Sequence, residues 1–423
     1  MRVRFSPSRL SGGITVPPSK SLSHRAILCA ALAAGTSRIE NVIFSKDILA
    51  TLDAVKALGG EYRIQGNSVV VTGIQSPPAA AEIDCCESGS TLRFLIPIAS
   101  ALGVRATYRG EGKLPSRPLT PYLIEMTRNG VTFDYQNTMP FTTEGQLKNG
   151  TYTIDGDISS QFVTGLLFAL PLLEGSSVIR INGRLESKPY AEMTIAMLAR
   201  CGIQVNSLAD GYEIPGGQQY QPLDYRVEGD YSQAAFYAVA AACGGGDLLL
   251  GGLQPDSPQG DREILAIVQK CGAVVRWEAD GVLICAAKML RPFTVDAADI
   301  PDLVPILGVL ASCCEGRSVI TGAKRLKIKE SDRLAAISSA LNALGGQLTP
   351  FEDRLEIEGA GRFHAGTADS CNDHRIAMSV AVAALLADGP VELSCAQSVN
   401  KSYPDFYQDY QKLGGKADVI DVE

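Results

Sequence analysis

The sequence is poor in the residues and runs that mark several specialised classes of protein. Among 423 residues there are one Trp and three His, and the formal net charge is −8. No run of Lys and Arg is present, so we expect no nucleic-acid partner. The longest apolar stretch, from Phe162 to Leu173, contains a Gly and a Pro and is too short to span a bilayer. We expect a buried core helix there and no membrane partner.

The chain also shows no pattern of secretion, disulfide bonding or metal binding. The first residues lack the apolar segment of a signal peptide. The eleven Cys are odd in number, and the adjacent pairs Cys85-Cys86 and Cys313-Cys314 suit neither disulfide bridges nor metal ligation. We therefore expect reduced, mostly buried thiols in a cytoplasmic protein, and no metal ion.

The composition is that of a globular protein, and one local pattern recurs along it. Hydrophobic residues make up 46% and charged residues 20%, and the length suggests roughly two to four domains. Leu49, Leu52 and Val55 have helical spacing, and Gly59-Gly60 then favours a left-handed helix end. Two short strands are predicted next, around residues 62–72.

Helices that end at Gly recur at intervals of about 70 residues. They end at Gly130, Gly202, Gly272, Gly345-Gly346 and Gly414-Gly415. A short solenoid is one interpretation, but units of this length with both helices and strands favour two α/β domains of three units each. A boundary is predicted between Gly216 and Gly229. The strand-like residues 2–17 could belong with the second domain.

In the first half, basic and hydroxyl residues recur where the units begin a helix. Lys20, Ser21 and Arg25 follow two prolines and precede an expected helix from Ala26 to Ala34. Helix N-termini favour anions, although each such segment alone is also compatible with a simple N-cap. Comparable segments are residues 86–93, 115–118, 157–164 and 186–190, and a helix is expected from Phe94 in the first of them.

The second half repeats this arrangement. Asp302 precedes an expected helix from Leu303 to Ala311, and Lys329 and Arg333 lie four residues apart, so they are predicted to share a helix face. Glu330 next to Lys329 is a candidate acid/base pair, although such neighbours are more often surface ion pairs.

Two further segments of the second half carry cations. His374 and Arg375 precede an apolar helix expected from Ile376 to Leu386, where His374 could be a cap or a functional residue. Lys401 precedes the last expected helix. Cations at helix entries of an acidic protein predict small ligands that carry phosphate and carboxylate groups.

With these segments in place, the chain closely resembles the 5-enolpyruvylshikimate-3-phosphate (EPSP) synthases over nearly its whole length. The strings that carry the resemblance are Ser19-Lys-Ser-Leu-Ser-His-Arg25, Gly89-Ser-Thr-Leu-Arg93, Ser159-Ser-Gln161, Ser187-Lys-Pro-Tyr190, Lys329-Glu-Ser-Asp-Arg333, Asn372-Asp-His-Arg375 and Lys401-Ser-Tyr-Pro-Asp405. The resemblance implies two domains, residues 19–226 and residues 1–18 plus 227–423. Each would hold three βαβαββ units with its helices in the core, an inside-out α/β barrel, and the active site would lie in the cleft between domains.

The resemblance also implies a reaction of the shikimate pathway to chorismate and the aromatic amino acids. Phosphoenolpyruvate and shikimate 3-phosphate give the enolpyruvyl ether and phosphate, through a tetrahedral intermediate and without a metal or organic cofactor. Shikimate 3-phosphate would contact Lys20, Ser21, Arg25, Ser159, Ser160, Gln161, Ser187, Asp302 and Lys329. Phosphoenolpyruvate would contact Lys20, Gly89, Arg117, Gln161, Arg333, His374, Arg375 and Lys401.

The same resemblance implies roles for particular groups. Asp302 would take the proton of the 5-hydroxyl with Lys329 nearby, Glu330 would protonate the methylene carbon, and Lys20 would assist. Two positions depart from the family: Glu87 stands where Asn is frequent, and Arg325 stands where an Asn that contacts shikimate 3-phosphate is common. Gly89 is retained, which implies inhibition by glyphosate, and the resemblance implies a monomer.

Two alternatives remain. UDP-N-acetylglucosamine enolpyruvyl transferases share the fold and the type of chemistry, but that family usually carries a reactive Cys before its Arg-Pro, and residues 110–118 contain no Cys. A hypothesis from a different class is a non-catalytic α/β repeat scaffold, in which the cations would be surface charges.

Overall fold

The computed structural model describes residues 1–244, 246–359 and 361–421. Contacts between residues divide the chain into two compact units, one of residues Pro18–Val227 and one of Met1–Pro17 together with the chain from Glu228 onward. The boundaries predicted from the resemblance lie one residue away from these. Which substrate each unit binds stays a prediction.

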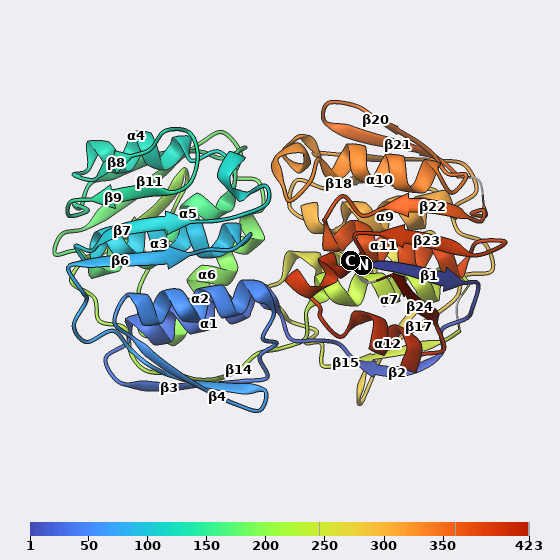
Figure 1. Ribbon diagram of the computed structural model, residues 1–423, viewed down its shortest axis with the longest axis horizontal. Coiled ribbons are helices and arrows are strands. Elements are labelled where there is room, and N and C mark those ends of the chain that lie inside the picture. Colours follow the sequence, from blue (N-terminus) through green and yellow to red (C-terminus); the bar gives the residue numbers. More distant parts are fainter. Residues whose placement is uncertain (245, 360, 422–423) are drawn as a thin grey trace. The chain divides into compact units, whose positions relative to one another are not determined.

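The unit of residues 18–227 alternates helices with short strands (Figure 1). Its helices are α1 (Lys20–Leu32), α2 (Lys46–Ala57), α3 (Gly89–Ala101), α4 (Thr120–Arg128), α5 (Ser160–Ala169) and α6 (Lys188–Arg200). Its four-stranded sheets have the orders β14-β3-β5-β4, β6-β7-β9-β8 and β10-β11-β13-β12. The strands are β3 (Thr36–Glu40), β4 (Glu61–Gln65), β5 (Ser68–Thr72), β6 (Ala80–Asp84), β7 (Arg105–Arg109), β8 (Thr132–Asp134), β9 (Phe141–Glu144), β10 (Thr151–Asp155), β11 (Ser177–Asn182), β12 (Asn206–Leu208), β13 (Gly211–Ile214) and β14 (Asp224–Arg226).

The other unit is built in the same way (Figure 1). Its helices are α7 (Tyr231–Ala242), α8 (Glu263–Cys271), α9 (Val304–Ser312), α10 (Arg333–Asn342), α11 (His374–Leu385) and α12 (Phe406–Lys412). Its sheets have the orders β16-β17-β15-β2, β18-β19-β21-β20 and β22-β23-β1-β24. The strands are β1 (Arg2–Ser6), β2 (Gly12–Thr15), β15 (Leu248–Gly251), β16 (Val274–Glu278), β17 (Gly281–Cys285), β18 (Thr294–Asp296), β19 (Arg317–Thr321), β20 (Gln347–Pro350), β21 (Arg354–Glu358), β22 (Gly366–Asp369), β23 (Val391–Ser394) and β24 (Lys416–Asp421).

Each of these sheets contains one parallel pair followed by two antiparallel pairs. In β6-β7-β9-β8, for example, β6 and β7 are parallel, whereas β9 is antiparallel to both β7 and β8. The strands follow the order βαβαββ along the chain in that sheet. In three sheets one strand comes from elsewhere: β14 lies parallel to β3, β2 lies parallel to β15, and β1 lies between β23 and β24. The predicted fold of repeated βαβαββ units is confirmed.

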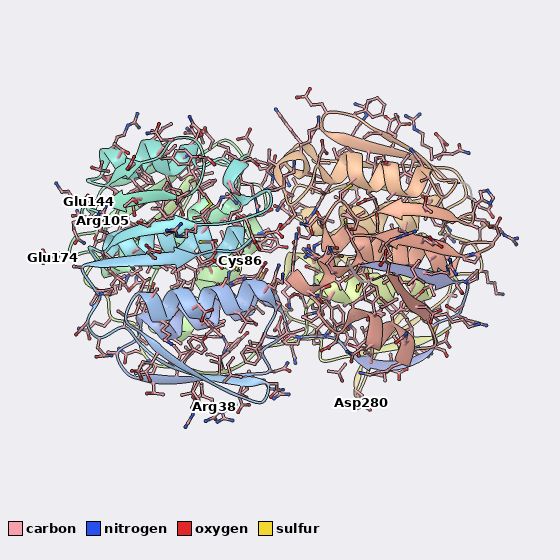
Figure 2. The ribbon with its side chains drawn as sticks, in the orientation of Figure 1. Arg38, Cys86, Arg105, Glu144, Glu174 and Asp280 are labelled. Atoms are coloured by element: carbon pink, nitrogen blue, oxygen red, sulfur yellow. The ribbon has the colours of Figure 1, made fainter. Side chains whose placement is uncertain are left out.

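Helices fill the interior of each unit, and sheets form its outer layer (Figure 1). Helices α3, α7, α9 and α11 are buried along their whole length. Helix α2 buries one face, with Ile48, Leu52 and Val55 inward. The sheets bury one face and leave the other to water, where Arg105 and Glu144 form an exposed ion pair of 3.6 Å (Figure 2). Burial of the helices' apolar surface is the main source of stability in such an arrangement.

In each repeat, the first glycine after the helix adopts the left-handed conformation. The φ angles are 96° at Gly59, 95° at Gly130, 78° at Gly202, 118° at Gly272, 87° at Gly345 and 101° at Gly414. They follow α2, α4, α6, α8, α10 and α12. A side chain with a Cβ is disfavoured at such angles, so the predicted helix ends are confirmed for a physical reason.

Three helix starts differ from the prediction. Helices α1, α3 and α11 begin at Lys20, Gly89 and His374 rather than at residues 26, 94 and 376. The side chains of Ser19, Ser88 and Asp373 accept hydrogen bonds from backbone N–H groups two or three residues later and so cap these helices. The polar residues that we placed before the helices therefore lie within their first two turns.

The prediction that Lys329 and Arg333 share a helix face is wrong. The short 3₁₀ helix Lys324–Ile328 ends before Lys329, which has an extended backbone. Asp332 then caps α10, and Arg333 is its first residue. The two cations therefore belong to different elements, and their spacing in the sequence does not determine how they lie.

The cysteines are free thiols, and fewer of them are buried than expected: Cys29, Cys85, Cys201, Cys271 and Cys314 are buried, Cys371 is exposed and the others are partly buried. In the described part of the chain, no helix is long and apolar enough to cross a membrane. The same residues contain no group of His, Cys, Asp and Glu suited to holding a metal ion.

Candidate functional site

In the unit of residues 18–227, Lys20 forms a mostly buried ion pair. Its Nζ lies 2.8 Å from Oδ2 of Asp47 in the first turn of α2, and the two side chains are 15% and 13% exposed. The main-chain oxygen of Asp47 lies 3.3 Å from the hydroxyl oxygen of Thr51 and 3.4 Å from that of Thr91. Lys20 of α1 is therefore tied to the starts of α2 and α3.

A chain of neutral groups continues from this ion pair. Nδ1 of His24 lies 2.8 Å from the Thr51 hydroxyl, which lies 2.7 Å from the Thr91 hydroxyl. Thr91 in turn donates to Oγ of Ser88, the cap of α3. Burial, together with the charges of Lys20 and Arg25, holds the pKa of His24 well below its usual value. His24 is therefore neutral and acts in positioning.

The first turn of α3 meets Arg117 and Gln161. A Cβ atom at Gly89 would lie only 2.6 Å from Nη1 of Arg117, in the loop before α4. Arg93 donates to Oε1 of Gln161 at 2.7 Å, and Gln161 donates to the Ser90 hydroxyl at 3.0 Å. The predicted phosphoenolpyruvate contacts of this unit are thus linked, and the lack of a side chain at Gly89 makes room for Arg117.

Arg25 joins α1 to α6. Its guanidinium donates to the Thr194 hydroxyl and to the carbonyl oxygens of Ser21 and Tyr190, at 2.8–2.9 Å. Burial lowers its pKa to about 10, so it remains a cation at neutral pH. Ser187, three residues before Tyr190, has a left-handed backbone (φ 55°) at the start of α6.

The remaining predicted residues of this unit lie at the start of α5. Ser159 caps the helix by accepting from the N–H of Gln161, and Ser160 is buried in the first turn. Serine caps at α1, α3 and α5 add no negative charge, so the partial positive charge of these helix ends is not neutralised.

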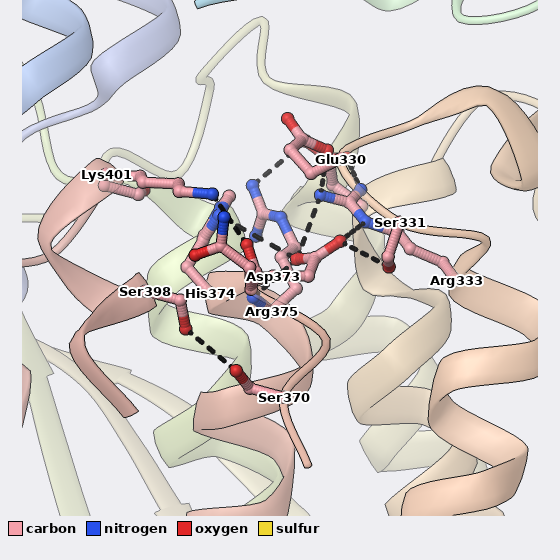
Figure 3. Close-up of polar contacts among 12 residues, drawn as sticks. Glu330, Ser331, Arg333, Ser370, Asp373, His374, Arg375, Ser398 and Lys401 are labelled. Atoms are coloured by element: carbon pink, nitrogen blue, oxygen red, sulfur yellow. Dashed lines mark hydrogen bonds and ion pairs between the residues drawn. The ribbon is translucent and has the colours of Figure 1, made fainter. Parts of the chain in front are cut away.

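In the other unit, Arg333 is the centre of the site (Figure 3). Its guanidinium is 1% exposed and donates to three carboxylates: Asp373 at 2.8 Å, Asp302 at 2.7 Å and Glu330 at 2.8 Å. Burial alone would lower its pKa, but these carboxylates hold the pKa of Arg333 well above its usual value. Arg333 is therefore a permanent cation that fixes the two predicted proton-transfer groups, Asp302 and Glu330.

Asp302 accepts from two arginines at once. Arg333 donates to its Oδ1 at 2.7 Å, and Arg375 donates to its Oδ2 at 2.9 Å. Burial acts to raise the pKa of this carboxyl, but the charges of Arg375, Lys329 and Arg333 overcome it and hold the pKa well below its usual value. Asp302 is therefore ionised and able to receive a proton.

Lys329 has a pKa shifted toward neutrality. Burial lowers its pKa to about 8, and the nearby Arg333 and Arg325 act in the same direction against Asp302 and Glu330. A lysine in this range can gain or lose a proton under physiological conditions.

His374 and Lys401 lie around the start of α11 (Figure 3). Of the two predicted roles of His374, helix cap or functional residue, the first is wrong, because Asp373 caps this helix. Nδ1 of His374 lies 3.8 Å from the Asp373 carboxylate, and Nζ of Lys401 donates to the main-chain oxygen of Asn372 at 2.6 Å. Both predicted contacts of phosphoenolpyruvate therefore lie at one helix entry.

The two departures from the family have defined surroundings. The Glu87 carboxylate is half-buried and lies against Gly112, in the loop that leads to Arg117. Arg325 is buried and donates to the main-chain oxygen of Ala298 at 2.7 Å. The charge of Arg325 also lowers the pKa of Lys329, which is a predicted site residue.

Sequence reasoning missed two acidic residues of the site. Asp47 pairs with Lys20, and Asp373 pairs with Arg333, although Asp373 lies within a string that we singled out. An acidic residue in the first turn of α2 is typical of any helix start, so Asp47 gave no distinctive signal. For Asp373 the signal was its position one residue before an apolar helix.

Comparison with known proteins identifies the family of the chain. Residues 5–410 match the family described as EPSP synthase (3-phosphoshikimate 1-carboxyvinyltransferase). The chain belongs to this family. A 3-phosphoshikimate 1-carboxyvinyltransferase of Clostridium novyi is 42% identical over 428 residues, and one of Clostridium kluyveri is 43% identical over 423 residues. Each alignment covers 98% of both chains.

Solved structures extend the similarity to three dimensions. EPSP synthase from Acinetobacter baumannii is 27% identical, with a TM-score of 0.81 over 99% of this chain and 100% of that one. The enolpyruvyl transferase NikO from Streptomyces tendae is 20% identical with a TM-score of 0.77, covering 99% of this chain and 98% of that one, and shows a shared fold. The predicted family and enzyme class are confirmed, and the sugar-nucleotide alternative is not favoured.

Proposed function

We propose that this EPSP synthase family member transfers the enolpyruvyl group of phosphoenolpyruvate to the 5-hydroxyl of shikimate 3-phosphate and releases phosphate. The observation that carries the proposal is the arrangement at Arg333. One buried guanidinium holds the carboxylates of Asp302 and Glu330, at 2.7 and 2.8 Å, and leaves each about one-fifth exposed. An addition to an enol needs a base and an acid placed in this way.

In the addition step, the 5-hydroxyl oxygen bonds to C2 of phosphoenolpyruvate while its proton passes to Asp302. Glu330 gives a proton to C3, which becomes a methyl group, and a tetrahedral intermediate forms. In the elimination step the methyl group loses a proton to Glu330, the C–O bond to phosphate breaks and the enolpyruvyl double bond forms again. Arg333, Arg375 and Lys401 stabilise the charge that develops on the leaving phosphate.

The arginines also control the basicity of Asp302. Arg333 and Arg375 depress its pKa, which makes the carboxylate a weak base. An anionic substrate competes for the same guanidinium donors, and each donor it takes reduces their effect on Asp302. Substrate binding therefore raises the pKa of Asp302 and prepares it to accept a proton.

In this proposal the unit of residues 18–227 supplies most contacts to shikimate 3-phosphate. Its serine-capped helix starts and Arg25 favour a phosphate group, while Lys20, Arg117 and Gln161 favour phosphoenolpyruvate. Lys20 is held by Asp47 at 2.8 Å. An incoming anion would compete with that carboxylate, as it does at Asp302. We also propose that the protein is a cytoplasmic monomer.

Phosphate release in the presence of both substrates tests the function. We expect release only when phosphoenolpyruvate and shikimate 3-phosphate are both present, and we expect Glu330→Gln to lower kcat by about 10²–10⁴-fold because the amide has no proton to exchange with C3. Glu352→Gln, at an exposed position (side chain 78% exposed), is the matched control and should behave as wild type. Turnover with a UDP-sugar acceptor alone would contradict the proposal.

Glyphosate is proposed to compete with phosphoenolpyruvate, and Gly89→Ala tests the fit around Arg117. The added Cβ lies 2.6 Å from Nη1 of Arg117, so the guanidinium has to move. We expect the Ki of glyphosate to rise by about tenfold or more and the KM of phosphoenolpyruvate to rise less.

The control for this substitution is Gly308→Ala in α9, where the new Cβ has ordinary contacts of 3.5 Å. Inhibition kinetics measured against varied phosphoenolpyruvate distinguish the variants. An unchanged Ki in Gly89→Ala, or a non-competitive pattern in wild type, would show that glyphosate binds elsewhere.

A further inference from the structure

A buried carboxyl group outside the residues implied by the family lies next to the site. Asp261 belongs to the short 3₁₀ helix Gly260–Arg262 that precedes α8, and it is 2% exposed. Its Oδ2 accepts a hydrogen bond from the Ser232 hydroxyl. Its Oδ1 is buried without a hydrogen-bond partner among the described residues. A buried carboxylate with an unpaired oxygen is unfavourable when charged, so this position needs an explanation.

Ser232 connects Asp261 with Arg375. It lies in the first turn of α7, and its main-chain oxygen accepts from Nη1 of Arg375 at 3.4 Å. Nη2 of the same guanidinium donates to Asp302 at 2.9 Å. The loop of Asp261 is also fixed to α7 by Gln259, whose side chain accepts from the N–H of Tyr231. Asp261 is therefore connected to Arg375 by hydrogen bonds through one residue, Ser232.

We infer that Asp261 is a positioning residue that holds Arg375 in place through Ser232, and that it does so as a neutral, protonated acid. In this form it keeps the start of α7 under Arg375 without competing for the guanidinium charge. That charge then stays available to Asp302 and to the phosphoenolpyruvate anion. The inference rests on the proposed role of Arg375 in binding that substrate.

The charges that face Asp261 bring the change between its neutral and charged forms close to neutral pH. Burial raises its pKa, and so do Asp302 before α9 and Asp230 at the cap of α7, while Arg375 of α11 and the Ser232 hydrogen bond lower it. The resulting pKa is about 7. Above that pH a second negative charge appears beside Arg375, which weakens its hold on an anionic substrate.

The kinetic consequence is an alkaline loss of affinity for one substrate. We expect the wild-type KM of phosphoenolpyruvate to rise by about tenfold between about pH 6 and pH 8.5, and we expect Asp261→Asn to remove that rise, because an amide mimics the neutral acid at every pH. Ionisation of the phosphoenolpyruvate phosphate affects all variants alike, so the difference between variants reports on Asp261. The KM of shikimate 3-phosphate should show no such difference.

Two further variants make the test specific. Ser232→Ala removes a hydrogen bond that lowers the pKa of Asp261, so the rise in KM should move to higher pH. Asp256→Asn changes the same charge at an exposed position of the preceding loop and should keep the wild-type profile. A merely structural role for Asp261 would shift KM equally at all pH values.

Stability gives an independent measurement with a defined sign. Since the folded pKa of Asp261 is raised, its contribution is fully present below the ordinary pKa of about 4 and is lost as the pH rises through about 7. We therefore compare the free energy of unfolding of Asp261→Asn with that of wild type at two pH values. The difference should favour the variant more at about pH 8 than at about pH 5.

The inference is overturned if Asp261→Asn keeps the wild-type rise in KM, or if Ser232→Ala leaves the position of that rise unchanged. Failure of the proposed function is a separate result, because it would appear as phosphate release that does not require both substrates.

Discussion

Replacing Asp302 by Asn is expected to lower kcat by about 10³-fold, within the range usual for a lost general base. The amide has nearly the same size as the carboxylate but cannot accept the proton of the 5-hydroxyl. In the structure the Asp302 carboxylate accepts hydrogen bonds from Nη1 of Arg333 at 2.7 Å and from Nη2 of Arg375 at 2.9 Å. Its fold and neighbours should therefore be retained in the variant, while the chemical step is slowed.

The same substitution should have an opposite effect on substrate binding. The amide of Asn keeps one acceptor oxygen without a charge, and its NH₂ group cannot accept from the other guanidinium, so Arg333 and Arg375 become more available to an anion. We expect the KM of phosphoenolpyruvate to fall or stay unchanged while kcat falls. Steady-state kinetics with each substrate varied in turn would separate these effects.

Asp280→Asn is the matched control for this experiment. Asp280 is exposed in the turn between β16 and β17, at the edge of its unit (Figure 2), so the variant changes net charge equally and should keep the wild-type kcat. A kcat of Asp302→Asn within tenfold of wild type would show that Asp302 is not the base. A rise in KM with unchanged kcat would instead make it a binding group.

Replacing Asp373 by Ala is expected to lower the free energy of unfolding by about 3 kcal/mol or more, because it leaves a buried cation short of a partner. Asp373 is fully buried and accepts from Nε of Arg333 at 2.8 Å and from the Ser331 hydroxyl at 3.1 Å. It also caps α11 by accepting from the N–H of Arg375 at 2.9 Å. Loss of a cap alone typically costs about 1 kcal/mol.

Two companion variants separate the contributions. Asp373→Asn keeps a capping oxygen and removes the charge, so its free energy of unfolding should lie between those of wild type and Asp373→Ala. Asp210→Ala removes an exposed partner of Arg180 and should leave the unfolding midpoint almost unchanged. Denaturant unfolding followed by circular dichroism measures all three, and equal midpoints for wild type and Asp373→Ala would contradict the assigned network.

The paired state of the site has a consequence for ligand binding. Arg333 and Arg375 are not isolated cations, since Asp302, Glu330 and Asp373 accept from them. A cation about 4 Å from an anion at an effective dielectric near 20 contributes roughly 4 kcal/mol before desolvation. An anionic substrate gains this attraction only by displacing a carboxylate, so binding and activation of Asp302 are coupled.

Several features could be predicted because they depend on neighbours in the sequence. The glycines that end α2, α4, α6, α8, α10 and α12 are required by local backbone conformation, and their regular spacing reported the repeat. The site residues could likewise be predicted at helix starts, because each lies in a short string of polar residues directly before or at the beginning of an apolar helical pattern. The exact starts were wrong at α1, α3 and α11, since buried polar residues such as His24 and Arg25 interrupt the apolar pattern by which a helix is recognised.

The amino-acid sequence by itself therefore determined the repeat, the helix ends, the family and the cations at helix entries. Only the tertiary structure decided what those cations contact. Arg333 meets Glu330, Asp302 and Asp373, which lie 3, 31 and 40 residues away, and β1 completes a sheet between β23 and β24 at the other end of the chain. Such contacts depend on how separate elements pack, and local spacing carries no information on them, as the wrong prediction of a helix face shared by Lys329 and Arg333 showed.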